Sequence, residues 1–202
     1  MMLFTNITGL AGIALGLALL CHRAAGCFPL SRRLSLVITG VVFVLLLLPF
    51  PDLPPAAYMR GMVGDLSITT LVLLVYGFMR QAGVLLLLNA GLRRGGLLLL
   101  VLVAAVLYPL ALGTAPYDTY RWGYGEPWFL AMLLGFALAA IALRLPLVAC
   151  SISLAVLAWS VGWYESNNLW DYLIDPMLAI YAVFGLISAI FSRWRSAHNN
   201  GR

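Results

Sequence analysis

Residues 31–52 read SRRLSLVITGVVFVLLLLPFPD. Two arginines come first, an apolar run from Leu34 to Phe50 follows, and prolines and Asp52 end it. A helix needs about 20 apolar residues to cross a bilayer, with a lower limit of about 17. Proline removes a backbone donor and ends a helix. This stretch therefore predicts one membrane-spanning helix with a basic end and an acidic end.

The same order of charges repeats along the chain. All seven acidic residues fall in three of the segments between apolar runs. Ten of the twelve arginines fall in other segments, which alternate with the acidic ones along the chain or follow the last apolar run. The acidic residues are Asp52 and Asp65, then Asp118 and Glu126, then Glu165, Asp171 and Asp175. Cytoplasmic loops of membrane proteins carry an excess of arginine and lysine. We therefore expect the N-terminus outside and the C-terminus in the cytoplasm.

The apolar runs predict an all-α, polytopic transmembrane bundle that forms one membrane domain over residues 1–202. The predicted spans are residues 3–20, 34–50, 62–79, 97–113, 128–143, 146–163 and 176–191. Residues 80–96 leave two alternatives, because Arg80 interrupts a long apolar stretch. Either the third helix is long and tilted, or the segment lies along the membrane surface, which is the interpretation we favour.

Composition excludes several classes of protein. Hydrophobic residues make up 63% of the chain and charged residues 9%, whereas soluble domains average about 25% charged residues, so a soluble protein is excluded. The chain has no lysine, which excludes a retinal Schiff base. His22 and His198 lie beside arginines at predicted cytoplasmic ends, so we expect no haem, metal or other cofactor. The basic charge lies at membrane flanks, so nucleic acid is not an expected partner and anionic lipid is.

The first acidic segment leads into the third predicted span and contains Arg60 and Asp65. One interpretation is structural: Asp65 caps the helix N-terminus and pairs with Arg60. The other is functional: Arg60 binds an anionic headgroup or phosphate, and Asp65 orients it.

The second acidic segment places Arg121 among aromatic residues and puts Glu126 before Pro127. It predicts either an ordered interfacial loop or an aromatic and charged cradle for a lipid headgroup or a sugar.

The third acidic segment, residues 163–176, combines carboxylates, amides and aromatic rings. Asp175 before Pro176 predicts a helix N-cap. No capping position explains Glu165, Asn167, Asn168 and Asp171. Such side chains suit the binding of a polyol or sugar, of a cation, or of a partner's loop. If the three segments converge, Arg60, Asp65, Arg121, Glu126, Glu165 and Asp171 form one charged site, to which the two asparagines are added as candidate ligand-binding residues.

Residues 60–67, Arg-Gly-Met-Val-Gly-Asp-Leu-Ser, resemble the start of a membrane helix in the lipoteichoic acid synthase-like phosphoglycerol transferases. Residues 118–121, Asp-Thr-Tyr-Arg, are similar to a later outer segment of that family. The resemblance covers a minor part of the chain. The family's catalytic part is a large extracellular domain that we do not expect here, so the resemblance implies a membrane module that handles lipid headgroups or assists such an enzyme, and it carries over no catalytic residue.

These patterns lead to one expected function and two alternatives. We expect a bacterial inner-membrane accessory or scaffold protein of an envelope lipid or glycan assembly, whose outer face binds a lipid headgroup, a sugar or a partner. We expect membrane lipids as partners, together with a second membrane protein or further copies of this chain. The alternatives are a small transporter or flippase, and a membrane-embedded transferase or hydrolase that acts on a lipid-linked substrate at the outer surface.

Overall fold

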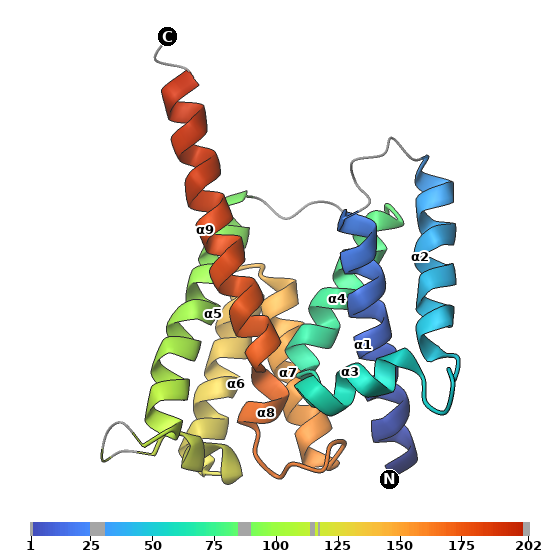
Figure 1. Ribbon diagram of the computed structural model, residues 1–202. Helices are drawn as coiled ribbons and strands as arrows, with labels where there is room; N and C mark the ends of the chain where they lie inside the picture. Colours follow the sequence, from blue (N-terminus) through green and yellow to red (C-terminus); the bar gives the residue numbers. More distant parts are fainter. Residues whose placement is uncertain (1, 25–30, 85–89, 114–115, 117, 200–202) are drawn as a thin grey trace.

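The computed structural model describes residues 2–24, 31–84, 90–113, 116 and 118–199, and these residues form helices and no strand. The helices are α1 (Met2–Ala24), α2 (Arg32–Leu47), α3 (Pro55–Val63), α4 (Ile68–Gln81), α5 (Ala90–Ala111), the 3-10 helix η2 (Tyr120–Tyr124), α6 (Pro127–Ala142), α7 (Pro146–Ser160), α8 (Trp170–Leu173) and α9 (Pro176–Asn199). Figure 1 shows the long helices side by side, with the N-terminus at the lower end and the C-terminus at the upper end. The predicted all-α class is confirmed.

Among the residues that the structure describes, two helical segments are long and apolar enough to cross a membrane, Asn6–Ala24 and Arg93–Ala111, each of 19 residues. Shorter apolar helices occupy Ile68–Gln81, Pro127–Ala142, Pro146–Ser160 and Pro176–Ser192. These findings agree with a membrane protein by helix length and composition alone.

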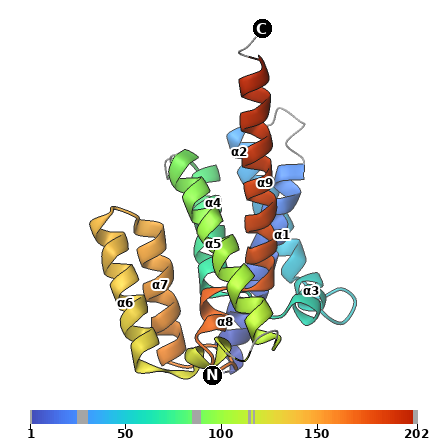
Figure 2. The ribbon, with the colours of Figure 1, turned by 90° about the vertical axis from the view of Figure 1, so that its left-hand side faces the viewer.

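The helices pack in neighbouring pairs. Helix α1 packs against α2, α3 and α4, helix α4 packs against α7, α6 against α7, and α5 against α9. Figure 2 shows the α6–α7 pair to one side of α4 and α5. The largest side chains with no exposed surface are Phe129, Leu169 and Tyr172, which join α6, α8 and the loop before α8 in one apolar cluster. These three side chains therefore form a well-buried part of the core at the lower end of the bundle.

The third predicted span, residues 62–79, is wrong at its start. Residues 55–63 form the separate helix α3, and α4 begins only at Ile68. Gly64 has a φ of 81°, a left-handed conformation that favours glycine and turns the chain between the two helices. In Figure 1, α3 lies across the lower part of the bundle, whereas α4 runs along it.

The prediction for residues 80–96 is also corrected. Helix α4 ends at Gln81, which excludes a long third helix, and residues 90–96 belong to α5. Residues 90–96 are thus helical, residues 85–89 lie outside the described part of the chain, and the position of the segment along the membrane surface stays a prediction. Helix α5 begins at Ala90, before the predicted residue 97, and its first turns include Arg93 and Arg94, which are good helix formers.

Candidate functional site

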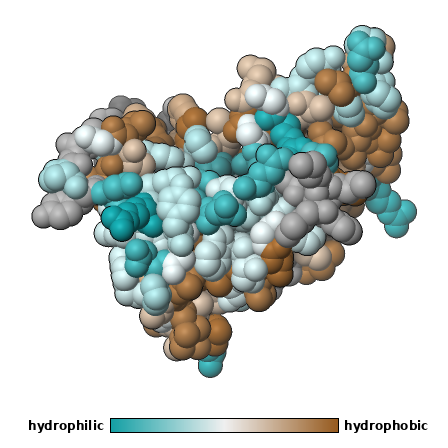
Figure 3. Space-filling model, turned by 90° about the horizontal axis from the view of Figure 1, so that it is seen from below, coloured by the Kyte–Doolittle hydropathy of each residue, from teal (hydrophilic) through white to brown (hydrophobic). Residues whose placement is uncertain are grey.

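A cavity of about 260 Å³ opens at the lower end of the bundle. It is lined by Asp65, Tyr164, Glu165, Ser166, Asp171, Ile174, Asp175 and Pro176. These residues come from the turn before α4, the loop after α7, helix α8 and the start of α9. Figure 3, which views this end from below, shows hydrophilic and pale residues over the middle of the face and hydrophobic residues toward its edges. Four of the seven carboxylates of the chain thus share one cavity.

Asp175 joins two helix N-termini and is 5% exposed. Its Oδ1 accepts a hydrogen bond from the backbone N–H of Leu178 at 2.8 Å, which caps α9 as predicted. Its Oδ2 accepts from the backbone N–H of Ser67 at 2.9 Å, from the Ser67 hydroxyl at 2.7 Å, and from the Thr70 hydroxyl at the start of α4. A negative charge between two helix N-termini is stabilised by both helix dipoles.

Asp65 pairs with Arg60 instead of capping α4. The Arg60 Nε donates to Asp65 Oδ1 at 2.6 Å, and Nη2 donates to Oδ2 at 3.0 Å. Arg60 Nη1 donates to the side-chain oxygen of Asn6 on α1 at 2.7 Å. The N-cap of α4 is Ser67, which accepts from the backbone N–H of Thr70. The capping half of the structural interpretation is therefore wrong, and the ion pair is confirmed.

The ion pair also determines what Arg60 can bind. The bond to Asp65 is the main cause that raises the pKa of the guanidinium above its ordinary value, and the charge of Glu165 adds to it. Because three of its nitrogens already donate within the protein, Arg60 is poorly placed to clamp a phosphate. The pair instead fixes Asp65 at the edge of the cavity.

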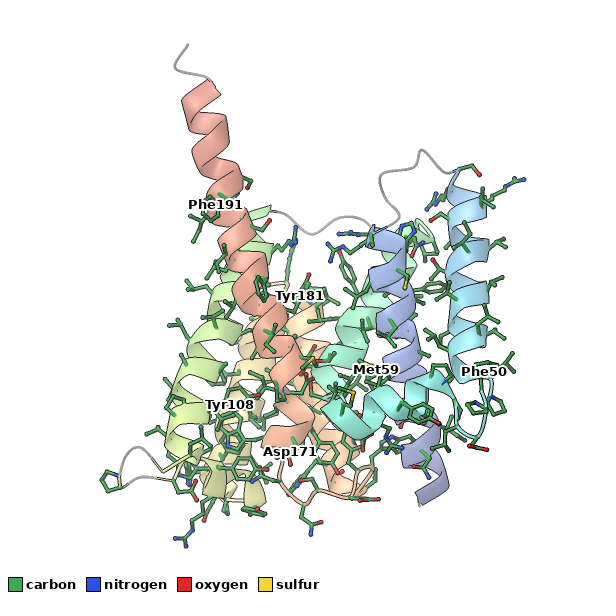
Figure 4. The ribbon with its side chains drawn as sticks, viewed as in Figure 1. Phe50, Met59, Tyr108, Asp171, Tyr181 and Phe191 are labelled. Carbon is green, nitrogen blue, oxygen red and sulfur yellow. The ribbon has the colours of Figure 1, made fainter. Side chains whose placement is uncertain are left out.

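Asp171 is held by phenolic and hydroxyl donors. The Tyr120 hydroxyl donates to both of its oxygens, at 2.8 and 2.9 Å, and Ser166 donates to Oδ2. Burial, and then the bond to Asp171, raise the pKa of Tyr120, so its phenol stays protonated at neutral pH. Figure 4 shows Asp171 near the lower end of the bundle, far below Phe191 on α9. Asp171 thus connects η2 with α8 and also faces the cavity.

Asn168 has a structural role that the sequence interpretation missed. It is 1% exposed, its amide donates to the Tyr120 carbonyl at 2.8 Å, and its side-chain oxygen accepts from the Trp170 backbone at 2.9 Å. Asn167 is exposed, and its backbone carbonyl accepts from the Trp159 indole at 2.8 Å. Neither asparagine lines the cavity. Both hold the loop that carries Glu165.

The three acidic segments converge only in part. Asp65, Glu165 and Asp171 line the cavity and Arg60 stands behind Asp65, whereas Arg121 and Glu126 do not line it. The structure does not bring these last two residues to the cavity wall, and their part in ligand binding stays a prediction. Sequence reasoning missed Tyr164 and Ser166 as lining residues. Their positions beside Glu165 were the available signal, because a loop that presents one residue to a cavity often presents its neighbours.

Glu165 is the exposed carboxylate of the cavity wall. The adjacent Tyr164 is buried, its hydroxyl donates to the Leu66 carbonyl at 2.8 Å, and burial raises its pKa above the ordinary value. An ionised carboxylate accepts hydrogen bonds but cannot donate one. A ligand that binds the carboxylates of this cavity must therefore bring donors, such as hydroxyl or ammonium groups. In the part of the chain that the structure covers, no group of three or more His, Cys, Asp or Glu residues is arranged to hold a metal ion.

Comparisons with protein-family models, with curated proteins and with solved structures found no match for this chain.

Proposed function

We propose that this chain is a bacterial inner-membrane accessory protein of an envelope lipid or glycan assembly, and that its outer-face cavity binds a hydroxyl- or amine-bearing headgroup or sugar. The observation that carries the proposal is the gathering of Asp65, Glu165, Asp171 and Asp175 around one cavity. Asp65 lies far in the sequence from the other three carboxylates, and the arginine beside them is already paired with Asp65. The cavity therefore suits a ligand rich in donors better than a bare phosphate.

The membrane arrangement that we propose has seven crossings, made by α1, α2, α4, α5, α6, α7 and α9, with the N-terminus outside and the C-terminus in the cytoplasm. The arginine-rich segments then lie on the cytoplasmic side, as the positive-inside bias requires, and the cavity and the acidic segments lie on the outer side. Helices α2, α4, α6 and α7 have 16, 14, 16 and 15 residues, which is fewer than the about 20 residues of a full crossing. A bilayer that thins locally around them accommodates such helices.

The chemistry of the cavity wall supports an accessory role. Three of its carboxylates, Asp65, Asp171 and Asp175, are engaged by donors of the protein itself. Glu165 is left as the carboxylate most accessible to a ligand. Binding and presentation of a headgroup to a partner enzyme needs no more than this. The resemblance of residues 60–67 to the phosphoglycerol transferase membrane helix agrees with this proposal, since Arg60 and Asp65 stand beside the cavity.

The test is native mass spectrometry of the protein released from lipid nanodiscs that contain envelope lipids. We expect a lipid or glycolipid with free hydroxyl or amino groups to remain bound to the wild type. The Glu165→Gln variant should lose most of this bound species, because the change removes the accessible negative charge without disturbing the other three carboxylates.

Glu126→Gln is the matched control, since Glu126 lies at the same end of the bundle but does not line the cavity. Retention of the ligand by Glu126→Gln and its loss from Glu165→Gln would support the cavity as the binding site. Equal retention by both variants, or a wild type that comes off with no bound species, would contradict the proposal. A second protein that remains bound in stoichiometric amount would identify the partner of the assembly.

A further inference from the structure

A second polar cluster lies at the end of the bundle opposite the cavity. It is formed by His22 in the last turn of α1, Ser35 and Thr39 on α2, and Gln81, the last residue of α4. The Ser35 hydroxyl lies 3.0 Å from the Nδ1 of His22 and 3.5 Å from its Nε2, so Nδ1 is the nearer ring nitrogen. Figure 1 shows the end of α1, the start of α2 and the end of α4 together in the upper part of the bundle. Ser35 and Thr39 are buried, at 6% and 1% exposure, whereas His22 and Gln81 are half-buried.

The side-chain amide of Gln81 has hydrogen-bond partners for its nitrogen but none among the described residues for its oxygen. Its Nε2 donates to the hydroxyl oxygens of Ser35 and Thr39, each at 2.9 Å. Its Oε1 is buried and has no hydrogen-bond partner among the described residues. A buried acceptor without a donor is costly. A half-turn of the Gln81 side-chain amide would bring this unpaired acceptor, Oε1, toward the hydroxyls of Ser35 and Thr39.

The directions of the remaining hydrogen bonds follow from the donors. Thr39 donates its hydroxyl to the Ser35 carbonyl at 2.9 Å. Ser35 accepts from Gln81, so its own hydroxyl hydrogen is available for the Nδ1 of His22. An imidazole nitrogen accepts only when it carries no proton. A Ser35 hydroxyl that donates to Nδ1 requires a neutral His22 whose proton is on Nε2.

Protonation of His22 reverses this order. Both ring nitrogens then donate, so Ser35 must accept from His22 and needs a new acceptor for its own hydroxyl hydrogen. The turned amide of Gln81 supplies that acceptor through Oε1. We propose that His22, Ser35 and Gln81 form a proton-operated hydrogen-bond switch, in which the charge of His22 selects one of two amide orientations of Gln81. This inference does not depend on the proposed function.

The surrounding charges are all positive. The titratable and charged residues on the same turns of the three helices are Cys21 and Arg23 on α1, Arg32 and Arg33 on α2, and Tyr76 and Arg80 on α4. No carboxylate is present on these turns, so an ion pair with His22 does not set the arrangement. Arg32 contributes in another way, because its Nε donates to the backbone carbonyl of Gln81 at 3.2 Å and holds the end of α4 against α2.

The composition of the chain allows a direct test. Gln81 is the sole glutamine, and His22 is one of two histidines. Protein labelled with ¹⁵N at the glutamine side chain and at the histidine rings, with His198→Asn to remove the second imidazole signal, is placed in nanodiscs. Its ¹⁵N NMR spectra are recorded from pH 5 to pH 8, the range in which imidazoles usually change charge.

We expect an unprotonated Nδ1 at pH 8, and a Gln81 amide signal that shifts with the same midpoint as the His22 ring. In Ser35→Ala, the ring should still titrate while the amide signal no longer follows it. A constant Gln81 signal while His22 titrates, a His22 that does not titrate over this range, or a protonated Nδ1 at pH 8 would overturn the proposal. The wild-type spectra alone decide the matter if Ser35→Ala does not fold.

Discussion

Replacement of Asp175 by asparagine should destabilise the fold far more than its small change in shape suggests. The carboxylate accepts from Leu178 through one oxygen and from Ser67 and Thr70 through the other. An asparagine has one oxygen, so it can cap α9 or α4 but not both. Asparagine is a good N-cap, and we therefore expect it to keep the bond to Leu178 and turn its NH2 toward the N–H of Ser67.

The size of the effect follows from the bonds that cannot be replaced. The hydroxyls of Ser67 and Thr70 lie 3.0 Å apart and can turn toward one another, but the backbone N–H of Ser67 cannot turn. Loss of its bond to a charged acceptor costs about 1.5–3 kcal/mol. Loss of the negative charge costs about 0.3–1 kcal/mol at each of two helix N-termini. The sum is about 2–5 kcal/mol.

The assay is reversible unfolding in mixed micelles of dodecylmaltoside and SDS, followed by tryptophan fluorescence. Asp118→Asn is the matched control: it is the same substitution on an exposed carboxylate that accepts from the Tyr120 backbone at 2.9 Å, and surface changes usually stay within about 0.5 kcal/mol. An Asp175→Asn variant that loses no more stability than Asp118→Asn would refute the bridging role of Asp175.

Three further predictions concern other parts of the structure. In Gly9→Ala, the added Cβ would lie 2.6 Å from the Nε of Arg60, so unfolding titrations should show a loss of about 1–3 kcal/mol; Gly61→Ala, which meets nothing within 4 Å, should show no such loss. Burial and Asp171 raise the pKa of Tyr120 in the folded state, so its contribution to stability is complete below the unfolded pKa of about 10 and falls as the pH rises above it. Tyr120→Phe should therefore weaken the loss of stability in unfolding curves recorded from pH 8 to pH 11. A dependence of stability on pH that is the same in the variant and the wild type would contradict this prediction. If α4, α6 and α7 cross the membrane, unfolding midpoints should be higher in bilayers of shorter lipids, and a higher midpoint in thicker bilayers would count against the crossings.

The sequence predicted the helices better than their ends. Apolar runs between charged or proline-rich segments give the positions of α6 and α7 to within a few residues, because proline begins both helices. The start of α4 was harder to predict. Residues 64–67 contain two residues that can cap a helix, Asp65 and Ser67, and the choice between them depends on Arg60, which engages Asp65 through the tertiary fold.

The candidate site was predictable only as a set of loops. Sequence reasoning placed Glu165 and Asp171 on one face, and both line the cavity. It could not separate them from Asn168, whose amide bonds the carbonyl of Tyr120, 48 residues away in the chain. It also could not show that the Arg60 guanidinium donates its hydrogen bonds to Asp65 and Asn6 within the protein. Such long-range hydrogen bonds leave no periodic pattern in the sequence.

The central claim is that the carboxylate-lined cavity faces the outside of a membrane crossed by seven helices. The most direct test is thiol accessibility in spheroplasts, with a membrane-impermeant maleimide and single cysteines placed in a chain that lacks Cys21, Cys27 and Cys150. A cysteine at position 165 should react in intact spheroplasts, whereas the native Cys21 restored alone should react only after the membrane is opened. Reaction of both sites in intact spheroplasts, or of Cys21 alone, would contradict the account.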